Sequence, residues 1–146
     1  MFNLAVMYYA IGKFENHGDE AKMKEQIKYF QYAAFLFDKI KQEIPTVIPS
    51  KEVQPDLSSD YLTFAGYIAL ANSQILIYEV AKKKNLALEL QAQLAHGISD
   101  LFNLAYSLSR ETLKKHINDD VRIHLKNRRD YYLSCSYLKY CKYNIE

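Results

Sequence analysis

Apolar residues recur every three to four positions along most of this chain, which is the spacing of amphipathic helices. The clearest segment covers residues 20–43, where the repeating positions are Met23, Ile27, Phe30, Ala34 and Phe37. Tyr29, Tyr32 and Leu36 add a second apolar face to the same segment. A helix with two apolar faces is expected to pack between two neighbours.

The same spacing predicts helices over residues 2–16, 60–84 and 86–109, and a last one from Asn118 or Asp119 to about residue 143. The apolar positions of the third helix are Tyr61, Phe64, Ile68, Ala71, Ile75 and Tyr78. Those of the fourth are Leu90, Leu94, Leu101, Ala105 and Leu108. Those of the last include Val121, Leu125, Tyr132 and Leu138.

The connections between these helices carry turn and capping residues. All three prolines, Pro45, Pro49 and Pro55, fall within residues 44–58 and predict a Pro-rich loop there. His17-Gly18-Asp19 predicts a tight turn with Asp19 as the N-cap of the second helix. Ser58 or Ser59 is expected to cap the third helix and Asn85 the fourth, and residues 110–117 form a polar connection.

No segment alternates with period two over the length of a strand, so the sequence predicts an all-α fold. Five helices with mostly short turns favour antiparallel helical hairpins. Small residues such as Gly66, Ala69, Ala95 and Gly97 would let helices approach closely, as in tetratricopeptide-like arrays. We expect residues 1–146 to form a single all-helical segment.

Composition limits the classes of function. The formal charge of +2 is too balanced to indicate nucleic-acid binding. Cys135 and Cys141 point to different faces of a helix, and two free thiols suit a reducing compartment. The apolar start lacks the basic leader of a signal peptide, and no apolar run reaches the ~18–20 residues needed to span a bilayer. A soluble, cytoplasmic protein is expected.

Motifs for catalysis are missing from the sequence. None of the four histidines stands at a metal-ligand spacing, and the four glycines form no phosphate-binding loop. We therefore predict no enzyme, no metal and no cofactor. Two interpretations stay open for the basic residues of the chain: a solvated helix face, or weak attraction to anionic lipid. These residues are Arg122, Lys126, Arg128 and Arg129, with Lys114, Lys115 and the lysines at 82–84.

Four motifs, in order, resemble the central part of the Bro-one (ALIX-type) domain of endosomal-sorting scaffold proteins. FNLA at residues 2–5 is similar to the family's FN-x-A helix start, and YFQYAAFLF at 29–37 resembles its HYQFASGAF helix. LANSQ at 70–74 resembles LAQAQ, and AQLA at 92–95 resembles part of AKLANQAADYF. The likeness weakens after residue 110. It implies a core fragment of a larger domain, with further elements on both sides.

The resemblance also implies a function. Family members bind the amphipathic C-terminal helix of a Snf-seven-type subunit of the third endosomal sorting complex, ESCRT-III, at the periphery of endosomal membranes. Carried onto matching positions, the apolar part of the binding patch is Ile77, Leu90 and Leu94. Its charged rim is Lys24 with Glu20 or Asp19. Three anchors of this kind suit a helix-in-groove contact.

Two alternatives remain at this stage. Spacing alone favours Leu90 and Leu94 as ordinary core residues of their helix, whereas the family resemblance favours the patch. If they form the patch instead, Leu94→Asp should abolish partner binding without unfolding the chain. The alternative function is a general helical scaffold that contacts peptides or anionic membranes through its basic and Tyr-rich surfaces.

Overall fold

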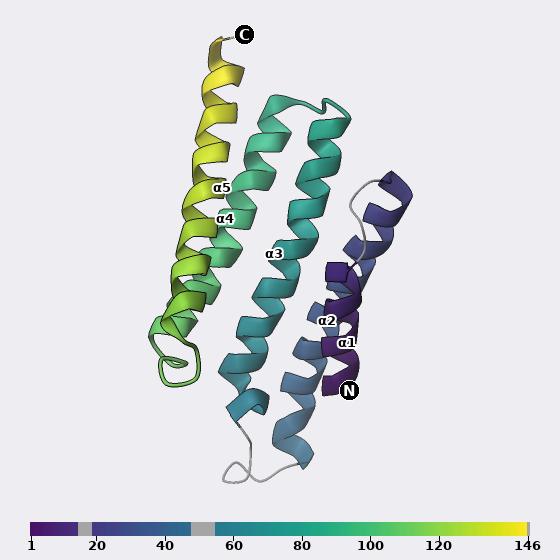
Figure 1. Ribbon diagram of the computed structural model, residues 1–146, viewed down its shortest axis with the longest axis vertical. Coiled ribbons are helices and arrows are strands. Elements are labelled where there is room, and N and C mark those ends of the chain that lie inside the picture. Colours follow the sequence, from purple (N-terminus) through teal and green to yellow (C-terminus); the bar gives the residue numbers. More distant parts are fainter. Residues whose placement is uncertain (15–18, 48–54, 146) are drawn as a thin grey trace.

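The computed structural model describes residues 1–14, 19–47 and 55–145. Within these ranges the chain forms α1 (Phe2–Phe14), α2 (Glu20–Val47), α3 (Ser59–Lys83), α4 (Leu88–Arg110) and α5 (Asp119–Ile145), with a short 3-10 turn, η1 (Pro55–Leu57), before α3. Each helix packs against the next one in sequence, and they alternate in direction across the molecule (Figure 1). The described ranges contain no strand. The predicted all-α, tetratricopeptide-like array is therefore confirmed.

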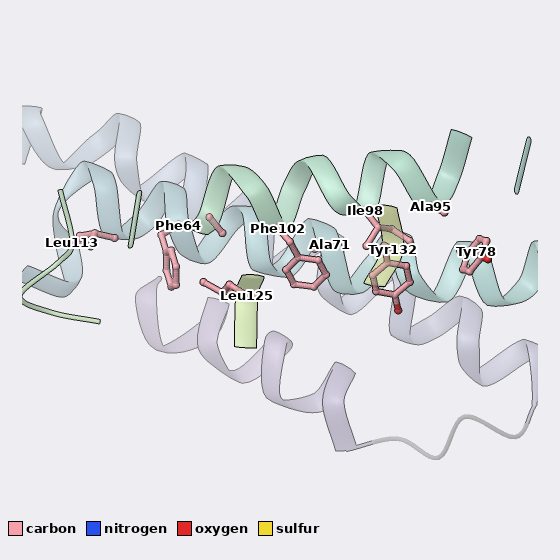
Figure 2. Close-up of a cluster of buried hydrophobic side chains, with 10 residues drawn as sticks. Phe64, Ala71, Tyr78, Ala95, Ile98, Phe102, Leu113, Leu125 and Tyr132 are labelled. Carbon is pink, nitrogen blue, oxygen red and sulfur yellow. The ribbon is translucent and has the colours of Figure 1, made fainter. Parts of the chain in front are cut away.

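Helix α3 is the central element because it is apolar on two faces. Leu62 and Ala69 pack into a core with α1 and α2, and Leu76 joins α2 residues Met23 and Phe30. On the other face Phe64, Ala71 and Tyr78 contribute to a core shared with α4 and α5 (Figure 2). Each set repeats every seven residues, about two helical turns. The sequence pattern identified only the second face.

Three predicted helix starts agree with the observed hydrogen bonds. The Ser58 hydroxyl accepts the N–H of Tyr61 at 3.2 Å, and the Asn118 side chain accepts the N–H of Val121 at 2.9 Å. Asp19 likewise accepts the N–H of Ala21 at 3.3 Å. These side chains satisfy backbone donors that the first turn of a helix leaves free. The other part of the predicted turn, residues 17–18, lies outside the described residues.

Two boundary predictions were wrong. Helix α2 continues to Val47, so residues 44–47 of the predicted 44–58 loop are helical. Ile44 packs against the core formed with α1 and α3 and holds this last turn, where Pro45 removes only one backbone donor. Asn85 is not an N-cap: its φ of 50° places it in a left-handed turn after α3, and α4 begins at Leu88. Asparagine tolerates that conformation better than most residues.

Of the five positions predicted to form the buried face of α4, only Ala105 is fully buried. The fully buried apolar positions of α4 are Ala92, Ala95, Ile98, Phe102 and Ala105. Leu90 is 41% exposed, and Leu94, Leu101 and Leu108 are only partly buried. Alanines allow α4 to pack closely against its neighbours, which displaces the larger leucines to the border of the contact. Gly97 matches the predicted close approach, whereas a Cβ at Gly66 would meet no atom within 4 Å.

The second apolar face expected on α2 is only partly covered. The Tyr8 ring of α1 lies 6.0 Å from that of Tyr29 and 5.8 Å from that of Tyr32. Tyr32 nevertheless remains 53% exposed. On α5, Leu125 and Tyr132 are buried as expected, but Val121 and Leu138 are exposed. A periodic apolar position is buried only where another helix reaches it.

Candidate partner-binding patch

Three helix ends meet at one end of the array. The start of α2, the end of α3 and the start of α4 lie together there (Figure 1). The residues singled out from the sequence occupy these ends: Glu20 and Lys24 on α2, Ile77 on α3, and Leu90 and Leu94 on α4. The fold thus brings five positions from three separate segments toward one region of the surface.

The charged rim centres on Glu20. Its Oε1 atom lies 2.7 Å from Lys84 Nζ and 3.0 Å from Lys24 Nζ. Lys84 follows α3, so the first of these ion pairs connects the start of α2 to the end of α3. Sequence reasoning included Lys84 only among the basic residues at 82–84 and missed its contact with Glu20. The lysine run at 82–84 was the available signal.

Glu20 and Asp19 differ in what they do. The Asp19 side chain is exposed and accepts a backbone N–H of the first turn of α2. The Glu20 carboxylate is bonded to two ammonium groups, and the hydrogen bond from Lys84, followed by that from Lys24, lowers its pKa. Glu20 is therefore held beside α3, whereas Asp19 serves the helix start. This favours Glu20 over Asp19 as the acidic member of the rim.

We expect Lys84→Gln to raise the pKa of Glu20 toward the ordinary value of 4.5 more than Lys24→Gln does, because Lys84 is the larger cause of the lowering. Folding lowers the pKa of Glu20. The stabilisation from its ion pair with Lys84 is therefore fully present above the ordinary pKa of Glu20 and is lost as pH falls through the lower, folded-state pKa. An NMR pH titration of the Glu20 carboxyl carbon measures both shifts. Lys22→Gln is the matched control, and equal effects of all three variants would contradict the expectation.

The three apolar residues are exposed to different degrees. Leu90 is 41% exposed. Ile77 is half-buried, and Leu94 is half-buried while packing against the core shared by α3, α4 and α5. The open question from the sequence thus has a divided answer: Leu90 is a surface residue, and Leu94 belongs partly to the core. Leu94→Asp would disturb the core as well as the patch. A substitution at Leu90 tests the patch with less effect on the core.

The contact between α3 and α4 fixes how these residues face one another. Gln74 Nε2 donates to the carbonyl of Leu94 at 3.3 Å, and a Cβ added to Gly97 would lie 2.4 Å from the same nitrogen. In an antiparallel pair, moving one turn forward along α3 corresponds to moving one turn back along α4. Ile77, three residues after Gln74, is therefore opposite the turn of α4 that holds Leu90 and Leu94. The three apolar residues therefore lie at a similar level along the α3–α4 pair.

The basic surface considered as an alternative site is smaller than expected. The Arg122 side chain is 16% exposed and donates to the backbone carbonyls of Ser109, Lys114 and Ile117, besides its ion pair with Asp119. Arg129 binds Asp130 and Asn103 and lies over the Tyr106 ring. Both arginines hold α4 and α5 together. Of the four basic residues of α5 named above, Lys126 and Arg128 remain exposed.

The described residues contain no metal-binding cluster, membrane-spanning helix or disulfide. Within ranges 1–14, 19–47 and 55–145, no cluster of three or more His, Cys, Asp or Glu residues is arranged to hold a metal ion. None of the helices in these ranges has both the length and the apolar character needed to cross a membrane. Cys135 and Cys141 are both free thiols.

Comparison with known proteins finds a matching family model and two sequence relatives. The family model of the BRO1-like domain matches residues 1–144. ALG-2 interacting protein X of Dictyostelium discoideum is 28% identical over 119 residues, which cover 82% of this chain and 15% of that protein. Human programmed cell death 6-interacting protein is 26% identical over 119 residues, covering 80% and 14%. The chain thus spans only about one-seventh of these relatives.

Structural comparison agrees on the fold. The chain superposes on the crystal structure of ALIX in complex with the SIVmac239 PYKEVTEDL late domain with a TM-score of 0.84 and 23% sequence identity. The match covers 92% of this chain and 19% of that one. With the family model spanning nearly every residue, the chain belongs to the BRO1-like domain family.

Proposed function

We propose that this chain is a protein-binding module that takes the amphipathic C-terminal helix of a Snf-seven-type ESCRT-III subunit. The binding surface is Ile77, Leu90 and Leu94, with Glu20, Lys24 and, at its edge, Asp19 as the charged rim. The observation that carries the proposal is Leu90, a large aliphatic residue left 41% exposed near the start of α4, at the end of the array where α2 also begins (Figure 1). A partner helix with apolar anchors would cover it.

Family membership supports an adaptor role over an enzymatic one. The matched ALIX structure is described as a complex with a late domain, and both sequence relatives are named as interacting proteins. Those descriptions concern other, much longer proteins. We extend them to this chain as a proposal: residues 1–146 act as one helical segment of a sorting scaffold that works at the surface of endosomal membranes.

The expected affinity is modest. Complete burial of an aliphatic side chain contributes about 1.5–3 kcal/mol, and part of the surface of Ile77 and Leu94 is already covered. Rim ion pairs at exposed positions add little, because water and salt screen them. After the loss of translational and rotational freedom, this suits a Kd in the micromolar range, which corresponds to about 8 kcal/mol.

Titration of a fluorescently labelled Snf-seven-type C-terminal helix into the folded chain tests the proposal. We expect saturable, micromolar-class binding that changes little between low and moderate salt, because apolar burial is not screened. A folded chain that fails to bind the helix would contradict it.

The alternative function, general contact with peptides or anionic membrane, makes the opposite prediction in the same assay. Charge attraction falls steeply as the Debye length shortens from about 30 Å at 0.01 M salt to about 8 Å at 0.15 M. Binding to anionic vesicles that disappears over this range, without binding of the helix, would favour that alternative. The engagement of Arg122 and Arg129 within the fold argues against it.

A further inference from the structure

A groove runs over α3 between α1 and α5, away from the residues of the proposed patch. It consists of two adjoining hollows of about 210 Å³ each, and both are lined by Tyr9, Phe64 and Ile68. A hollow of this size exceeds the ~150 Å³ cavity that holds a benzene molecule. Each one therefore has room for a large side chain. The groove follows α3 from Tyr61 to Asn72, whereas Ile77 lies further along that helix.

The two hollows differ in chemistry. The first is lined mainly by apolar and aromatic side chains, with Phe2 and Val6 from α1 and Phe37 from α2. The second has an apolar floor that includes Phe64, Phe102 and Leu125, which lie close together in the core (Figure 2). We call the first hollow the apolar half of the groove and the second the basic half.

The basic half is named for three side chains around its floor: Lys13, His124 and Arg128. None of the residues lining it is Asp or Glu. Lys13 lies 5.4 Å from the centre of the Tyr9 ring, and within the described part of the chain neither Lys13 nor Arg128 is in an ion pair. Two cationic side chains that no carboxylate of the described residues pairs with attract an anionic group into the hollow.

Tyr9 adds a directed hydrogen-bond donor. Its hydroxyl oxygen accepts from Asn72 Nδ2 at 3.2 Å, and the same nitrogen donates to the carbonyl of Ile68 at 2.8 Å. The phenolic proton of Tyr9 is not used in either bond, so it is available to an acceptor. Burial raises the pKa of Tyr9, so the phenol keeps that proton at neutral pH.

We propose that this groove binds a peptide segment of a partner protein that carries a large apolar side chain close to an acidic one. The apolar side chain fills the apolar half, and the Asp or Glu carboxylate enters the basic half, between Arg128 and Lys13 and within reach of Tyr9. The charge of the lining favours this occupant over a basic or neutral peptide. A free anion would leave the apolar half empty, and a flat bilayer does not enter a groove between helices.

Selection from a random peptide library displayed on phage tests the proposal, with the folded chain as bait. We expect enrichment of peptides that combine a large apolar residue with Asp or Glu. The best peptide is then measured beside a twin in which every acidic residue is replaced by its amide, and the twin should bind at least about tenfold more weakly.

Arg128→Glu is the decisive variant, and Lys126→Glu is its matched control. Both side chains are exposed on α5 and undergo the same change of charge, but only Arg128 lines the groove. We expect the first to lose at least about tenfold in affinity for the acidic peptide and the second to change little. Equal losses, enrichment without acidic residues, or self-association of the chain in place of peptide binding would overturn the proposal. So would loss of binding in Leu90→Asp, which would move the peptide to the other patch.

Discussion

Leu90→Asp is expected to abolish binding of the Snf-seven-type helix and to leave the chain folded. The substitution removes an apolar anchor whose exposed 41% contributes about 1 kcal/mol when a partner buries it, a factor of about five in Kd. It also places a carboxylate where the partner must bury its own leucine or methionine, which adds a desolvation cost. Isothermal titration calorimetry of the helix peptide measures the affinity, and circular dichroism measures the fold.

The fold is expected to survive because Leu90 is 41% exposed and lies outside the buried positions of α4. Leu104→Asp is the matched control: it makes the same substitution on the same helix at a side chain that is 45% exposed. Its position lies roughly 21 Å further along the axis, at 1.5 Å per residue. Loss of binding in both variants would indicate a nonspecific effect, and retention in Leu90→Asp would exclude Leu90 from the patch.

Phe102→Ala is expected to lower the free energy of unfolding by about 3–5 kcal/mol, the range measured for large-to-small changes of buried aromatic residues. Phe102 is 4% exposed and sits where α3, α4 and α5 meet. Its ring stacks on that of Tyr132 at a centroid distance of 6.2 Å (Figure 2). Alanine would leave a cavity between three helices that pack as one unit.

Urea denaturation followed by circular dichroism measures this change, with Leu104→Ala as the control on the same helix. The control should stay within about 0.5 kcal/mol of the unmodified chain, as is usual for exposed positions. Because small proteins are stable by only about 5–15 kcal/mol, the loss at Phe102 would be a large part of the total. A loss below about 1 kcal/mol would mean that the core shared by α3, α4 and α5 repacks around the gap.

Some features of this protein follow from local physical chemistry and were predictable from the sequence. The three-to-four-residue spacing of apolar side chains reflects the helix itself, so the helical class and the number of helices were correct. Ser58 and Asn118 were correct because a capping side chain acts on a backbone donor only two or three residues away. The motifs that resemble the Bro-one domain pointed to the family that the comparison then identified.

Other features depended on which helix covers which face. Spacing gives α4 an apolar stripe that includes Leu90. In the structure α4 lies so close to α3 and α5 that Ala95 and Ala105 fill the contact, and Leu90 stays exposed. Arg122 was interpreted from the sequence as a surface cation, whereas it donates to one backbone carbonyl at the end of α4 and to two in the connection before α5. Neither the exposure of Leu90 nor the partial burial of Arg122 can be derived from periodicity. Periodicity shows which face of a helix is apolar, but it does not show which segment covers that face.

The proposed patch also combines residues known before the structure with contacts that only the structure shows. The family resemblance supplied Ile77, Leu90, Leu94, Glu20 and Lys24 as separate positions on three helices. Only the tertiary structure added Lys84, whose ion pair with Glu20 joins residues distant in sequence, and the antiparallel alignment that sets Ile77 opposite Leu90 and Leu94. Local sequence determines the helices of this protein because helix formation is governed by near neighbours. Tertiary packing decides its surface, because the exposure of a side chain depends on contacts between distant segments.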